Sequence, residues 1–104
     1  MADGPGPVVA VVQARMGSSR LPGKVLMRAA GRSLLAHLLE RLRAARLLDA
    51  VVVATTRSPG DDALAAEASR LGVGVFRGEQ ADVLARFVGA AAMTGAGTVV
   101  RITG

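Results

Sequence analysis

The 104-residue sequence contains no cysteine, tryptophan or tyrosine, and it has only two phenylalanines and one histidine. Without cysteine, the chain can form neither a disulfide framework nor a thiolate metal site. With His37 as the sole histidine, a zinc site built from several histidines is also excluded. Because aromatic residues make up only 2% of the chain, its core must be built from Val, Leu and Ala.

Long apolar segments are also missing. No apolar run reaches the roughly 20 residues that a membrane helix needs. The N-terminal "MADGPGP" has an acid and no cation, and no long apolar stretch follows it, so a signal peptide is not expected. We therefore expect a cytoplasmic protein without a membrane partner. Two Gly-Pro steps predict a disordered tail over residues 1–7, which leaves residues 8–104 as one domain.

The net charge of +5 suggests an anionic partner, although solvated arginines on helix faces would explain it equally well. Nucleic acid is disfavoured as that partner, because the arginines are scattered along the chain and Tyr and Trp are absent as stacking platforms. Binding of nucleic acid through net charge alone stays as a third hypothesis, and it predicts an affinity that falls steeply with salt. The single lysine, Lys24, lies in a segment that also carries glycines and serines.

Apolar strands alternate with amphipathic helices along the chain. We expect strands at 8–13, 50–56, 73–76 and 98–103, and a loop over 14–32 with a short strand or turn near 25–27. We expect one helix in 33–48 capped by Ser33, one that starts at Ser58 or Asp61 and ends before Gly72, and one at 82–93. This order predicts an α/β fold, a Rossmann-like three-layer sandwich with a mainly parallel sheet.

The first strand runs into "QARMGSSRLPGK", residues 13–24. In open parallel sheets ligands bind beyond the carboxyl ends of the strands, and a Gly/Ser loop with several cations is suited to polyphosphate. The segment is not a P-loop, because Gly17 and Gly23 are one residue too far apart and Val25 follows Lys24. No G-x-G-x-x-G follows the first strand either, so a dinucleotide fingerprint is absent. A loop of this length inside a compact domain is typical of a functional segment.

The same segment resembles the signature of the cytidylyltransferase family, which includes CMP-Kdo and CMP-sialic acid synthetases, and it is most similar to the spore-coat polysaccharide type. The resemblance continues through "VVATT", "GVGVFRG", "DVLARF" and "VVRITG". It implies a nucleotide-diphospho-sugar transferase fold. It also implies a reaction in which CTP and a sugar or sugar acid give an activated sugar and pyrophosphate with Mg²⁺.

The resemblance also implies which residues bind the nucleotide. Arg15 and Lys24 are the candidate catalytic residues, since Arg15 can bind phosphate oxygens bidentately and Lys24 can follow the charge onto the leaving group. The candidate nucleotide contacts are Ala14, Arg15, Gly17, Ser18, Ser19, Arg20, Lys24 and Gly104.

Members of this family are longer than the present sequence, and they continue after "RITG" with an aspartate that binds Mg²⁺. We therefore expect a truncated member that lacks the metal ligand, and we assign no metal ligand in this chain. Whether such a chain is an enzyme is left open, and the alternative is a catalytically silent nucleotide-binding or interaction fragment. An exposed "TVVRIT" strand would invite association, so a homo-oligomer is possible through this sheet edge.

For several other polar residues, structural roles compete with functional ones. We expect Asp82 to be a helix cap in preference to a ligand, and His37 to pack against its helix in preference to acting as a base. Thr55 and Thr56 end a strand at the ligand edge and either touch the nucleotide or bond their own turn. Three arginines have either a role in the site or a structural role: Arg77, Arg86 and Arg101.

Overall fold

The computed structural model describes residues 6–16 and 26–103. Residues 1–5 of the predicted tail lie outside this range. Pro7, the last residue of that tail, is bonded to the folded part of the chain, because its carbonyl accepts hydrogen bonds from Gly97 N at 2.9 Å and Thr98 N at 3.1 Å.

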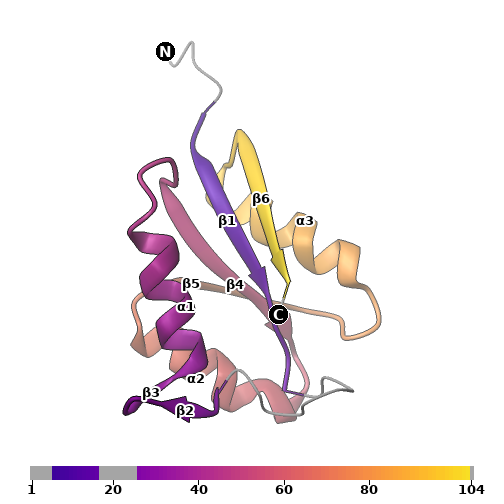
Figure 1. Ribbon diagram of the computed structural model, residues 1–104. Coiled ribbons are helices and arrows are strands. Elements are labelled where there is room, and N and C mark those ends of the chain that lie inside the picture. The colour runs from indigo at the N-terminus through magenta and orange to yellow at the C-terminus, as the bar shows by residue number, and fades with distance from the viewer. Residues whose placement is uncertain (1–5, 17–25, 104) are drawn as a thin grey trace.

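Four parallel strands form the sheet, in the order β5-β4-β1-β6 (Figure 1). They are β1 (Val8–Gln13), β4 (Ala50–Thr56), β5 (Gly74–Gly78) and β6 (Thr98–Thr103). The predicted parallel sheet is thus confirmed, and three of its strands have the predicted bounds. The chain adds β4 and β5 on one side of β1 and then crosses back to place β6 on the other side.

Helices cover both faces of this sheet. Helices α1 (Leu34–Arg43) and α2 (Asp62–Arg70) lie on one face, and α3 (Val83–Thr94) lies on the other (Figure 1). Alternate residues of β1 supply both cores, since Ala10 and Val12 pack with α1 and α2 whereas Val9 and Val11 pack towards α3. The three-layer α/β/α sandwich is therefore confirmed.

A two-stranded hairpin lies where we predicted loop and a short strand near 25–27. It consists of β2 (Arg28–Ala29) and β3 (Arg32–Ser33), which pair antiparallel. Its two turn residues, Ala30 and Gly31, have φ angles of 54° and 80°. A type I′ turn, whose twist matches that of the two strands it joins, needs a positive φ angle at both of its central residues. Alanine is an unusual residue at such a position.

Helix α1 begins as predicted and ends earlier. Ser33 Oγ accepts a hydrogen bond from Ala36 N at 3.0 Å, which confirms the N-cap. The helix ends at Arg43, five residues before the end of the predicted segment at residue 48. The chain turns there because Asp49 must reach β1, where Asp49 N donates to Val8 O and Val8 N donates to the Asp49 carboxylate, both at 2.7 Å.

Two other element ends also differ from the prediction. A 3-10 turn, η2 (Pro59–Asp61), precedes α2, and neither Ser58 nor Asp61 makes the capping hydrogen bond that we predicted. Strand β5 begins and ends one to two residues later than 73–76, because it pairs with β4 as far as Thr56. Helix α3 has the predicted Asp82 cap, whose carboxylate accepts from Ala85 N at 2.9 Å.

Candidate nucleotide-binding site

The candidate site lies at the carboxyl edge of the sheet, where β1 ends between β4 and β6 (Figure 1). Because the chain leaves β1 in opposite directions to form these two neighbours, this is the topological switch point of the fold. In open α/β sheets, ligands bind in the crevice at this position. The segment that follows β1 is the one predicted to bind phosphate.

Of the predicted nucleotide contacts, the structure describes Ala14 and Arg15. Ala14 N donates to Ala54 O at 3.1 Å, so a contact between Ala14 and a nucleotide would have to use its carbonyl. Arg15 is half-buried and directly follows it at the sheet edge. The other predicted contacts lie outside the described residues: Gly17, Ser18, Ser19, Arg20, Lys24 and Gly104.

A buried carboxylate anchors the start of this segment. Asp61, only 4% exposed, accepts a hydrogen bond from Met16 N at 2.6 Å and another from Thr56 Oγ1. Thr56 ends β4 and is fully buried. The first turn after β1 is therefore fixed to Asp61, 45 residues away in sequence, and through Asp61 to Thr56 at the end of the neighbouring strand.

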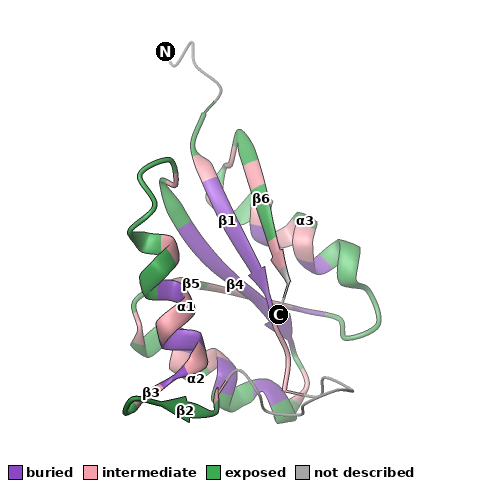
Figure 2. Cartoon of the chain, in the orientation of Figure 1, coloured by how far each residue is buried: buried purple, intermediate pink, exposed green. Residues whose placement is uncertain are grey.

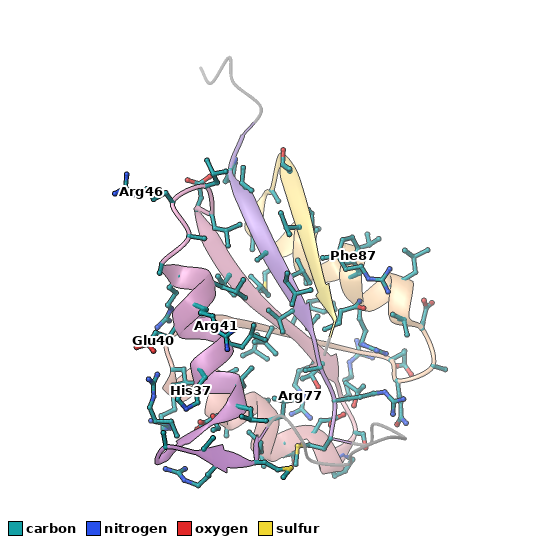
Figure 3. All side chains as sticks on the ribbon, viewed as in Figure 1. His37, Glu40, Arg41, Arg46, Arg77 and Phe87 are labelled. Carbon is teal, nitrogen blue, oxygen red and sulfur yellow. The ribbon has the colours of Figure 1, made fainter. Side chains whose placement is uncertain are left out.

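Arg77 at the end of β5 braces the same region. Its guanidinium donates to Thr56 O at 2.7 Å and to Ser58 O at 3.0 Å, and it pairs with Asp62 at 2.8 Å. Figure 3 shows its side chain at the carboxyl end of the sheet. These contacts give Arg77 a structural role in shaping the turn between β4 and α2.

A hollow of about 290 Å³ lies on the α3 side of this edge. Gln13 of β1 and Arg101 of β6 supply its polar groups, and Phe87 supplies an aromatic ring 5.9 Å from the Arg101 guanidinium carbon. The amide of Gln13 is held in place because Nε2 donates to Val83 O at 3.0 Å. The hollow thus combines apolar walls with an amide and a cation, which suits a planar polar group.

Arg86 is 4% exposed and donates to Glu79 O and Gln80 O, at 2.8 and 2.7 Å. Its Nε, like Thr55 Oγ1, has no hydrogen-bond partner within residues 6–16 and 26–103. These bonds fix the loop between β5 and α3, which gives Arg86 a structural role. The buried hydroxyl of Thr55 does not bond its own turn, which was one of the two roles left open for it.

The acids of this region are engaged by protein groups. Glu79 pairs with Arg57 at 2.6 Å, Asp62 pairs with Arg77, and Asp82 caps α3. Among the residues that the structure describes, no three His, Cys, Asp or Glu side chains cluster as a metal site requires.

Sequence reasoning missed the two polar side chains that organise the site, Asp61 and Gln13. The sequence pattern predicts a helix cap for Asp61 and a strand end for Gln13. The sequence "SPGDD" does contain a signal for Asp61. It has two adjacent acids, and because one acid is enough to cap the helix, the other is available for a different contact. Gln13 carries no comparable signal, because its partner Val83 lies 70 residues away.

Comparison with known proteins identifies the family. Residues 9–104 match the family model described as Cytidylyltransferase. The spore coat polysaccharide biosynthesis protein SpsF of Bacillus subtilis is 39% identical over 101 residues, which cover 93% of this chain and 42% of that protein. An uncharacterized protein of Methanocaldococcus jannaschii, MJ1063, is 44% identical over 97 residues, which cover 93% of this chain and 40% of that protein.

Solved structures agree with this result. A cytidylyltransferase from Leptospira borgpetersenii superposes with a TM-score of 0.86 at 38% identity, over 94% of this chain and 41% of that one. A CMP-2-keto-3-deoxy-manno-octonic acid synthetase complexed with CTP superposes with a TM-score of 0.77 at 25% identity, over 94% and 40%. The chain thus spans about two fifths of the length of these relatives. The chain belongs to the cytidylyltransferase family.

Proposed function

We propose that this chain supplies the CTP-binding part of a cytidylyltransferase that transfers CMP to a sugar or sugar acid for cell-surface polysaccharide. One observation carries the proposal: β1 ends at the carboxyl edge of the sheet, at its topological switch point, and the sequence "QARMGSSRLPGK" begins with the last residue of β1. The family match over residues 9–104 and the CTP complex of a structural neighbour support the choice of nucleotide.

In the proposed reaction, an oxygen of the sugar forms a bond to the α-phosphorus of CTP. The bond from that phosphorus to the bridging oxygen breaks, pyrophosphate leaves, and a hydroxyl proton is released to solvent. The protein's task is to position the groups and to stabilise the charge. We assign the phosphates to Arg15 and Lys24, and the base to the hollow beside Gln13 and Phe87.

Mg²⁺ belongs to the proposal as the ion that accompanies the triphosphate, and it is therefore included in the experiment below. No step is assigned to it, because the described residues form no cluster that would hold it.

The proposal places the protein in the cytoplasm, where CTP is present. In the described part of the chain, no helix is long and apolar enough to cross a membrane. We further propose that two copies associate through the open edge of β6, where Val100 is 39% exposed. Sedimentation velocity should then show a dimer that Val100→Lys reduces to a monomer, and a wild-type chain that sediments as a monomer at high concentration contradicts this step.

The alternative, a silent nucleotide-binding or interaction fragment, differs in one product. It would bind CTP and release no pyrophosphate when a sugar acid is added. A pyrophosphate assay with CTP, Mg²⁺ and an added sugar acid separates the two functions.

CTP binding is tested first, by thermal unfolding with CTP, UTP, ATP or GTP in the presence of Mg²⁺. We expect CTP to raise the melting temperature most, and Lys24→Ala to abolish the shift. Arg46→Ala is the matched control, because it removes the same charge from an exposed position after α1, at the opposite end of the sheet (Figure 3). A shift that is equal for all four nucleotides, or that survives in Lys24→Ala, contradicts the proposal.

A further inference from the structure

Asp61 directly precedes α2, in the position where a side chain normally caps a helix, yet it makes no capping hydrogen bond. Its two carboxylate oxygens are engaged elsewhere, one by Met16 N at 2.6 Å and the other by Thr56 Oγ1. Aspartate is among the best capping residues. Its carboxylate is therefore used to hold another segment, although the local sequence favours the cap.

This carboxylate is fixed on several sides. Burial of a charge is unfavourable unless hydrogen bonds satisfy it, and here both oxygens accept one. Thr56 Oγ1 also accepts from Ser58 N at 3.1 Å, and Arg77 binds Thr56 O. The nearby start of α2 favours a negative charge at this position. Asp61 is thus a rigid acceptor, and the Met16 amide is the group that it positions.

Met16 lies between Arg15 and the segment 17–25 that the proposed function assigns to phosphate. The direction in which the chain leaves β1 depends on two hydrogen bonds, from Ala14 N to Ala54 O and from Met16 N to Asp61. These two bonds flank Arg15. The backbone on both sides of the proposed phosphate-binding arginine is therefore attached to β4 and to the residue before α2.

We propose that Asp61 is a positioning residue for nucleotide binding, which fixes the Met16 peptide so that the neighbouring Arg15 is presented to the phosphates. This inference rests on the proposed function. It has a distinctive consequence, because Asp61 is itself an anion close to the proposed site of another anion. Charge alone predicts that removal of Asp61 tightens CTP binding, whereas positioning predicts that it weakens CTP binding.

Two substitutions separate charge from position. Asp61→Ser keeps a residue that is favoured as a helix cap, but its side chain is one bond shorter and cannot reach Met16 N. Asp61→Asn removes the charge and keeps an oxygen that can accept from Met16 N. Calorimetric titration with CTP and Mg²⁺ should show binding about tenfold weaker for the serine variant, the loss expected for one charge-assisted hydrogen bond. The asparagine variant should bind at least as tightly as wild type.

Asp62→Asn is the matched control, since it removes the same charge from the next residue, which is exposed and whose ion pair is with Arg77. Its CTP affinity should stay within about twofold of wild type, an effect expected of an exposed charge. Hydrogen exchange of the Met16 amide is the second readout, and it should be fast in Asp61→Ser and slow in wild type and Asp61→Asn. If Asp61 had only a structural role, Asp61→Ser would lower the melting temperature, and the folded variant would bind CTP as tightly as wild type.

The outcomes are distinct. A serine variant that binds CTP as tightly as wild type overturns the inference, and so does an asparagine variant that is as weak as the serine one. If the serine variant does not fold, fast exchange of Met16 in Asp61→Asn overturns the inference, and slow exchange with undiminished CTP affinity supports it. If wild type binds no nucleotide, the proposed function fails and the inference fails with it. A calorimetric titration of wild type with CTP that shows no binding distinguishes this result from failure of the inference alone.

Discussion

The two neighbours of β1 differ in how completely they are covered. On one side, β4 is buried from Val51 to Thr56, beneath α1 and α2 on one face and α3 on the other. On the other side, Val100 of β6 is 39% exposed, and Leu84 and Val88 of α3 are 71% and 55% exposed. Figure 2 shows this contrast as a mostly purple β4 on one side of β1 and green stretches on β6 and α3.

The polar contacts differ in the same way. At the end of β4, the buried groups Asp61 and Thr56 are bonded to each other and to the segment after β1. At the end of β6, the described contact of Arg101 is with the Phe87 ring. The difference indicates that the chain by itself completes the rigid support for the proposed phosphate segment, while the surface beside β6 is left open to other contacts.

The largest effect should come from a matched pair of leucines in the first turns of α2 and α3. Leu64 is fully buried, whereas Leu84 is 71% exposed. We expect Leu64→Ala to lower the free energy of unfolding by about 2–5 kcal/mol, because it leaves a cavity. We expect Leu84→Ala to change it by less than about 0.5 kcal/mol. Urea unfolding followed by circular dichroism measures both, and equal losses would remove the contrast between the two sides.

An intermediate effect is expected from Gly89→Ala, on the inner face of α3. A Cβ at this position would lie 2.7 Å from Phe76 Cε2, so the ring would have to move. Overpacking should cost about 1–3 kcal/mol, and alanine should regain roughly 1 kcal/mol over glycine in a helix, so the free energy of unfolding should fall by up to about 2 kcal/mol. The same unfolding experiment tests this, with the solvent-side Leu84→Ala as its control. A more stable variant would mean that α3 is loosely packed on both of its faces.

The smallest effect concerns Glu67 on α2, which ties α2 to the hairpin. Hydrogen bonds from Arg70 and then from Ser33 lower the pKa of its carboxyl below the ordinary value. A lowered folded-state pKa contributes stability above the ordinary value of about 4.3, and this stability is lost as the pH falls through the folded-state pKa. Glu67→Gln should therefore lower the melting temperature modestly at pH 7. Below pH 4, the melting temperature of this variant should fall less steeply with decreasing pH than that of wild type. Parallel curves of melting temperature against pH for both proteins would contradict this assignment.

The elements could be predicted from the sequence because their causes are local. Runs rich in β-branched residues indicated β1, β4 and β6, and Ser33 and Asp82 indicated the starts of two helices. The end of α1 could not be predicted, since the contact between Asp49 and Val8 joins residues 41 apart. The site divides in the same way. Its position follows from strand order, whereas the roles of Asp61 and Gln13 depend on partners 45 and 70 residues away.

The central place of β1 has a consequence for synthesis of the chain. Val9 pairs with Ala50 on one side and with Val99 on the other, so both neighbours of the first strand are made long after it. Parallel pairing across such separations closes large loops and is slow. Strand β1 is thus synthesised before both of the strands that enclose it. Its apolar run of Val8–Val12 stays exposed until β6 is translated and docked, and this interval is when the chain is most prone to aggregate.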